Sequence, residues 1–346
     1  MDYEQTVSRL CGLPGPSGFE FEAAADAAEM LRPFVDEVMV DHMYSVIGVR
    51  RCGKKGAPKL LLDAHLDEVG YIVTGHKDGY LTFTSLGGVD PRILPNQELT
   101  LLTDPPLPGI VACLPPHLQS REEMEKAKPM KQLYLDIGMT QEEAVRRVPI
   151  GTPAVYRCGC EPMGKGLLCG KAMDDRVCFA AILGTMERLA GQELDVDIYV
   201  LGSSQEETQF TGAITGAYKA APDLCVALDV THAYSPDASP DKTAELGGGP
   251  VIGVGSNCVR WMSERMERAA REGKIPYQIE VIAGESGTNG WPIQMSRVGV
   301  ATTLLSIPLR YMHTPVETVS LGDLEGTAAV LAAFVRGLGE EVARRV

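Results

Sequence analysis

The stretch KLLLDAHLDEVG, residues 59–70, is the segment that decides the fold. It opens as an unbroken apolar run and then turns polar, with His65 and Asp67 just past the change. A run without polar alternation is typical of a strand that other elements cover on both faces, as in a parallel sheet between helices. The polar continuation predicts that the carboxyl end of this strand is left open.

The chain on the carboxyl side repeats an alternation of helix and strand. From about residue 166, amphipathic stretches such as 174–190 alternate with short apolar runs such as 195–204. This order predicts an α/β protein whose mostly parallel sheet is sandwiched by helices. Residues 2–12 and 19–32 are expected to form further helices.

A block of different character interrupts this pattern. Between residues 71 and 160, short β-type runs are separated by Gly, Pro and Asp-Gly, which predicts a small antiparallel barrel or sandwich. We therefore expect a discontinuous α/β domain made of residues 1–70 and 161–346. Residues 71–160 would be a β-rich domain inserted into it.

Composition excludes several classes of protein. The chain has 346 residues, of which 45% are hydrophobic, and a formal net charge of −14. Such a charge argues against a broad nucleic-acid surface and gives no support to binding anionic lipid. The sequence shows no secretory signal and no apolar run long enough for a membrane span. Nine scattered cysteines fit free thiols in a reducing cytoplasm.

Side chains that can bind metals follow several of the predicted strands. Each alone has an ordinary explanation, such as a helix cap, a solvated charge or a hydrogen-bonded structural histidine. Together they would gather at one edge of one sheet, where unpaired carboxylates repel each other and resist burial. Mixed imidazole and carboxylate ligands suit zinc, and also cobalt or manganese. The residues are His65, Asp67, Asp174, Asp175, Glu206, Glu207, Asp229 and His313.

The spacing within this set suggests separate tasks. His65 and Asp67 are two residues apart in a strand and point to the same face, so Asp67 can accept the second ring N–H of His65. Glu206 and Glu207 are adjacent, so one is expected to bind a cation while the other takes a proton from water that the cation activates. Asp174 suits a bridging position between two ions.

With these residues in view, the sequence resembles the tetrahedral or glutamyl aminopeptidases, metallopeptidase family forty-two. Some members of that family carry the name cellulase M or endoglucanase. The resemblance covers nearly the whole chain. Its motifs are PSGFE (16–20), DAHLDEVGYIV (63–73), GGVDPRILPNQ (87–97), GKAMDDRV (170–177), QEE (205–207), ALDVTHA (227–233), IPYQIEV (275–281), SGTNG (286–290) and IPLRYMHTPVE (307–317).

The resemblance implies a role for each residue of the set. His65 and Asp229 would complete one metal site, Glu207 and His313 the other, and Asp174 would bridge them. Asp67 would orient His65, and Glu206 would be the general base. The Asp174–Asp175 bond would be cis. The family fold combines a zinc-peptidase sheet with an inserted PDZ-like β domain. Members commonly form tetrahedral dodecamers that release N-terminal residues from peptides.

The sequence departs from the family pattern at four positions. Thr208 and Gln209 replace Val and Gly, and Asn289 and Gly290 replace Asp and Ala, which affects substrate preference and loop shape rather than hydrolysis.

Two other functions compete with an aminopeptidase. One is a glycoside hydrolase, which needs two carboxyl groups but gives no role to the histidines. Another is a non-catalytic metal-binding scaffold. We expect peptide substrates, two divalent ions and a homo-oligomer, with no nucleic-acid or membrane partner.

Overall fold

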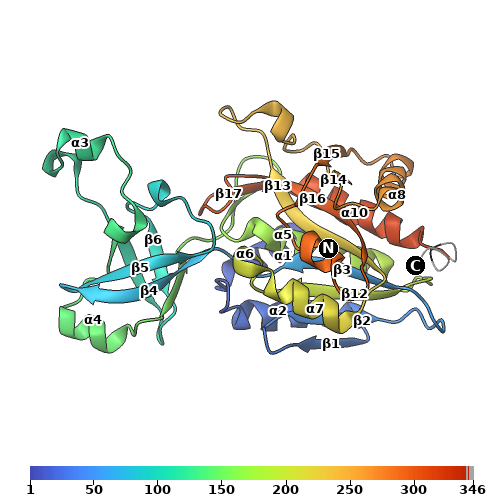
Figure 1. Cartoon of the computed structure of the whole chain (residues 1–346), viewed down its shortest axis with the longest axis horizontal. Helices are drawn as coiled ribbons and strands as arrows, with labels where there is room; N and C mark the ends of the chain where they lie inside the picture. Colours follow the sequence, from blue (N-terminus) through green and yellow to red (C-terminus); the bar gives the residue numbers. More distant parts are fainter. Residues whose placement is uncertain (340–341, 343–346) are drawn as a thin grey trace.

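The computed structural model describes residues 1–339 and residue 342. Within these residues, eleven strands form one large sheet, and a second set of strands closes into a barrel that stands apart from it (Figure 1). None of the helices in this part of the chain has a stretch long and apolar enough to cross a membrane. The nine cysteines all lie in it and are free thiols.

The large sheet follows one continuous path with a short branch. Strands β14 (Val251–Gly255) and β15 (Gln278–Ile282) form the branch, with β14 paired to β16 and β15 to β14. The path runs in the spatial order β1 (Glu37–Val40), β2 (Val46–Arg50), β12 (Asp197–Ser203), β3 (Lys59–His65), β13 (Leu224–His232), β16 (Ala301–Arg310), β17 (Glu317–Ser320), β11 (Leu167–Gly170) and β10 (Glu161–Pro162).

Parallel pairing at the centre of the sheet brings the functional strand ends together. Strands β12, β3, β13 and β16 are parallel neighbours, while the pairs toward both edges are antiparallel. In the register, Ser203 of β12 lies opposite His65 of β3. The carboxyl ends of these central strands therefore meet at one edge of the sheet.

Helices cover both faces of the sheet, as the unbroken apolar run of β3 requires. Leu60 and Leu62 pack into the larger core with five helices, whereas Leu61 packs into the opposite core with two others. The first group is α1 (Tyr3–Gly12), α2 (Phe21–Leu31), α5 (Met173–Leu189), α8 (Arg260–Glu272) and α10 (Leu321–Arg336); the second is α7 (Thr211–Ala220) and α9 (Gly290–Gln294).

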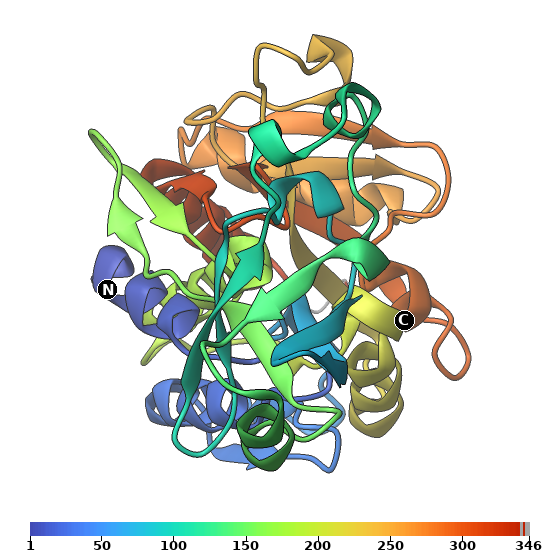
Figure 2. The same ribbon diagram turned by 90° about the vertical axis from the view of Figure 1, so that its left-hand side faces the viewer.

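The inserted segment forms a closed antiparallel barrel with its own core around Leu81, Leu99 and Leu135. Figure 2 shows this barrel facing the viewer, in front of the α/β part. Its strands, in order around the barrel, are β4 (Gly70–Lys77), β5 (Tyr80–Leu86), β8 (Tyr134–Asp136), β7 (Leu107–Ala112), β6 (Glu98–Leu101) and β9 (Pro153–Tyr156); its helices are α3 (Arg121–Met124) and α4 (Gln141–Arg147).

The predicted fold class, an α/β sheet between helices with a small β-barrel, is confirmed. Of the two forms left open for the inserted block, the barrel is the one present. We keep the domain division at residues 71 and 160 as a proposal.

Candidate metal centre

The candidate metal centre lies at the carboxyl ends of the central strands. His65 is the last residue of β3, and Asp229 lies in the carboxyl-terminal half of β13. Glu206 and Glu207 begin the short helix α6 (Glu206–Gln209), which follows β12. Asp174 and Asp175 are at the start of α5, and His313 is in the loop after β16. The structure therefore brings all these residues to one place.

Asp174 lies between the two imidazoles. Its Oδ1 is 3.0 Å from Nε2 of His65, and its Oδ2 is 3.3 Å from Nε2 of His313. Nε2 of His313 is also 3.2 Å from Oε2 of Glu207, and Nε2 of His65 is 3.9 Å from Oε2 of Glu206. One carboxylate therefore presents an oxygen to each half of the cluster.

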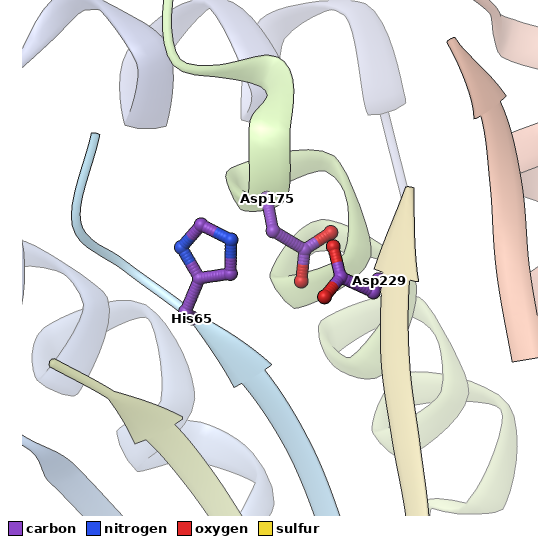
Figure 3. A group of neighbouring side chains, drawn as sticks. All are labelled: His65, Asp175 and Asp229. Carbon is purple, nitrogen blue, oxygen red and sulfur yellow. The ribbon is translucent and has the colours of Figure 1, made fainter. Parts of the chain in front are cut away.

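Each of two sets of ligand atoms is compact enough to hold an ion, and because both sets include His65 they are alternatives rather than two sites filled together. His65, Asp174 and Glu207 form one set, and His65, Asp175 and Asp229 form the other, with the atoms of each set within 4.8 Å of one another. Figure 3 shows the carboxylates of Asp175 and Asp229 side by side, facing His65. Asp175 is among the side chains that the sequence marks as able to bind metal, but the family resemblance does not include it among the ligands. The Asp174–Asp175 peptide bond is cis, as predicted.

Backbone carbonyls fix the orientation of both histidines. Nδ1 of His65 is 3.1 Å from the carbonyl oxygen of Asp67, and Nδ1 of His313 is 2.6 Å from that of Gly88. A carbonyl oxygen only accepts hydrogen bonds, so each Nδ1 carries the proton in the neutral ring. In the metal-free protein each Nε2 faces carboxylate oxygens and donates its N–H to them. If a cation took the place of that proton, the Nε2 lone pair would face the ion, which is the tautomer that a metal ligand requires.

The carboxylate of Asp67 has a different main contact from the one predicted. Its Oδ1 is 3.5 Å from Nδ1 of His65, but the two oxygens accept closer hydrogen bonds from the backbone N–H groups of Glu206 (3.0 Å) and Glu207 (3.1 Å). Gln205 has a left-handed φ of 56°, which turns the chain so that these N–H groups face Asp67. Asp67 therefore holds the turn that carries both glutamates.

Two further residues of the centre were not identified from the sequence. Buried Glu317 accepts hydrogen bonds from the backbone N–H groups of Met173, Asp174 and His313, so it connects the start of α5 to the loop after β16. Gly88, in the inserted block, supplies the carbonyl group that orients His313. Both lie in motifs quoted above, GGVDPRILPNQ and IPLRYMHTPVE. Glycine has no side chain that could signal a role, and no sequence pattern marks Glu317 as an acceptor for backbone N–H groups.

Electrostatics in the metal-free protein are unfavourable at this centre. Burial raises the pKa of Glu206 to about 10, and the charges of Asp229 and Glu207 act in the same direction. Burial also raises the pKa of Asp229 well above its ordinary value. Burial alone would lower the pKa of His313, but its hydrogen bonds with Asp174 and Glu207 outweigh this and raise the pKa to about 11.

These residues fit divalent cations. Among the described residues, Oε1 of Glu207 and both carboxylate oxygens of Asp175 are buried without a hydrogen-bond partner. Buried carboxylates of this kind are costly unless they are paired or coordinate a metal. Cations between the acids and the two Nε2 atoms would satisfy the unpaired oxygens and offset the mutual repulsion.

A cavity of about 710 Å³ opens beside the centre. Asp174, Glu206, Glu207, Asp229 and His313 form one part of its wall. Another part is formed by residues 280–282 of β15 and the segment 283–288. The metal centre is thus exposed to a space large enough for part of a peptide.

An α/β sheet with such a cluster at the carboxyl ends of its strands defines a metal-dependent hydrolase. The chain belongs to the M42 glutamyl aminopeptidase family, whose model matches residues 45–330. It is therefore a peptidase, and the family and the metal cluster together make it a metal-dependent aminopeptidase.

Relatives cover almost the full length of the chain. The lysyl aminopeptidase of Pyrococcus furiosus is 32% identical over 98% of this chain and 98% of its own. The aminopeptidase APDkam598 of the archaeon Desulfurococcus kamchatkensis is also 32% identical, with a TM-score of 0.92 over 99% of this chain and 97% of its own. The TET1 peptidase of Pyrococcus horikoshii, described as able to assemble into a tetrahedron or a large octahedral shell, is 27% identical, with a TM-score of 0.85 over 97% of this chain and 100% of its own.

Proposed function

We propose that this chain releases N-terminal residues from peptides by hydrolysis at a centre of two divalent cations, zinc, cobalt or manganese. The observation that carries the proposal is the position of Asp174, with one carboxylate oxygen 3.0 Å from His65 and the other 3.3 Å from His313. Asp174 would bridge the two ions. His65 and Asp229 would complete one site, and Glu207 and His313 the other. When bound, such ions lower the pKa of water and polarise a carbonyl group.

Glu206 is the proposed general base. It belongs to neither candidate set of ligands, yet its side chain is only 9% exposed and its Oε2 is 3.9 Å from Nε2 of His65. A free carboxylate in this position can take a proton from the attacking water and pass it to the leaving amine. Cationic charge at the centre opposes the effect of burial on Glu206, which favours the ionised form that a base requires.

Asp67 is the proposed positioning residue for this base. Its carboxylate holds the backbone N–H groups of Glu206 and Glu207, so the two adjacent side chains keep separate directions. Its backbone carbonyl also holds Nδ1 of His65. A change at Asp67 would therefore disturb both the base and one proposed ligand.

The assembly and partners follow from relatives rather than from this chain. The shells described for the TET1 peptidase support a closed homo-oligomer, and membership of a peptidase family supports peptides as substrates. The geometry of the metal centre has no bearing on a cytoplasmic location. It gives no support to a glycosidase activity. Two carboxyl groups would suffice for sugar hydrolysis, and the two oriented imidazoles would then have no role.

Replacing Glu206 by Gln tests the proposal. With a panel of aminoacyl anilides and added zinc or cobalt, E206Q should lower kcat by roughly 10²–10⁴, because a general base contributes about this much. Metal analysis should find both ions still bound. The control is E272Q at the exposed end of α8, outside the cavity, which removes the same charge and should be unchanged. Normal turnover by E206Q would refute the base, and a wild-type chain inactive on the whole panel would favour a scaffold.

A further inference from the structure

The cavity beside the metal centre extends to a second group of side chains that the proposed chemistry does not use. Beyond the cluster, its wall includes Thr231 on β13, Glu280 on β15 and Glu285 in the loop that follows. Apolar side chains line the space as well; they include Phe210, Val230, Ile282, Leu304 and Met312. The cavity therefore combines carboxylates outside the metal centre with an apolar lining.

Outside the metal centre, the fully charged residues in the described wall of this cavity are all acidic. In the part of the chain that the structure describes, its lining contains acidic residues and two histidines, and neither lysine nor arginine. Glu280 and Glu285 are its charged residues outside the metal centre, and neither takes part in an ion pair among the described residues. A carboxylate at a cavity wall that has no cationic side chain as a partner favours binding of a cationic ligand.

Glu280 is held in place by its neighbour on β13. Its Oε1 accepts a hydrogen bond of 3.2 Å from Oγ1 of Thr231. Asp229 and Thr231 are two residues apart in β13, so they point to the same face and lie roughly 6.6 Å apart along the strand. Thr231, which holds Glu280, is thus displaced from Asp229 along β13 by about the length of a four-carbon side chain with its terminal amine.

We propose that this cavity takes the side chain of the substrate's N-terminal residue and selects lysine or arginine. This inference rests on the proposed aminopeptidase function. The apolar side chains contact the aliphatic stem of the substrate residue, and Glu280 and Glu285 contact its charged end. An acidic N-terminal residue would meet two carboxylates of like charge, so it is excluded by the same groups.

Substitutions of the two glutamates test the proposal with substrates whose N-terminal side chains differ in charge. The wild-type chain, loaded with zinc or cobalt, should cleave lysyl and arginyl anilides with a higher kcat/KM than leucyl or glutamyl anilides. E280Q and E285Q should each lower kcat/KM for the lysyl substrate by roughly tenfold, the loss expected for one charge-assisted hydrogen bond. The same variants should change leucyl turnover by less than twofold. E272Q is the matched control and should leave the ratio of lysyl to leucyl turnover unchanged.

The outcomes separate this inference from the function on which it rests. A wild-type preference for leucyl or glutamyl substrates, unchanged in E280Q and E285Q, would overturn the inference and leave the aminopeptidase intact. If no anilide were cleaved, the proposed function would fail. In that case, calorimetric titration of amino-acid amides into the metal-loaded chain would test the inference, because this measurement needs no turnover. Tighter binding of lysine amide than of leucine amide, lost in E280Q, would support it, and equal binding would overturn it.

Discussion

Replacing Glu317 by Gln should weaken the metal centre without changing the side chain of any proposed ligand. The carboxylate of Glu317 is 2% exposed. Its Oε2 accepts from the backbone N–H groups of Met173 (2.8 Å) and Asp174 (3.2 Å), and its Oε1 accepts from that of His313 (2.8 Å). A Gln side chain keeps one acceptor oxygen and replaces the other by an amide NH2 group, which donates hydrogen bonds. In either orientation of this amide group, at least one of the three backbone N–H groups faces the NH2 group instead of an acceptor oxygen.

The size of the effect follows from which N–H group is left unpaired. Met173 and Asp174 are buried, whereas His313 is partly exposed, so the Gln oxygen should remain on the side of Met173 and Asp174. The N–H group of His313 then loses its acceptor, which costs about 1–3 kcal/mol of unfolding free energy. In the metal-free protein burial and the charge of Asp174 raise the pKa of Glu317, so removing this charge offsets part of the loss. The destabilisation should therefore be larger with metal bound.

Urea unfolding with chelator and with saturating zinc measures this difference, and calorimetric titration measures metal affinity. Affinity should fall about 10- to 100-fold, as for other groups that orient metal ligands. The control is Glu325→Gln on α10, whose side chain is 65% exposed and whose loss should change neither quantity. If E317Q matched the wild-type chain in zinc affinity and in stability under both conditions, the reasoning would be refuted.

The remaining predictions concern pH, backbone crowding and core packing. In the metal-free chain the pKa values of Glu206 (about 10, ordinarily 4.5) and His313 (about 11, ordinarily 6.5) are raised, so the folded state binds more protons than the unfolded state between these values. Stability should therefore fall as pH rises from about 5 to 10. Melting curves with chelator should show a falling Tm, and zinc should flatten the trend; a rising Tm would contradict it. Gly212→Ala places a methyl group against the backbone of Ser204, which cannot move aside like a side chain, and should cost about 1–3 kcal/mol in urea unfolding. Leu62→Ala empties a fully buried site in the sheet and should cost about 2–5 kcal/mol by the same measurement.

Local sequence patterns were sufficient to predict the central strands of the sheet and the cluster of imidazoles and carboxylates at their ends. The apolar run before His65 predicted a strand covered on both faces, and Leu61 and Leu62 do pack into opposite cores. Because central parallel strands end at the same edge, residues that follow such strands could be placed together without knowing the rest of the chain. The residues of the cluster come together for this reason, while their roles stay predictions.

The sequence by itself determined the α/β class, the inserted β-rich block and the convergence of His65, Asp174 and Glu207, because these depend on periodicity and strand order. Only the tertiary structure showed the contacts made by Gly88 and Glu317. These contacts depend on the backbone path across the whole molecule, in which the carbonyl of Gly88 meets an imidazole 225 positions away. A backbone carbonyl or amide has no signature in the sequence, so its use in orienting a ligand is decided by packing alone.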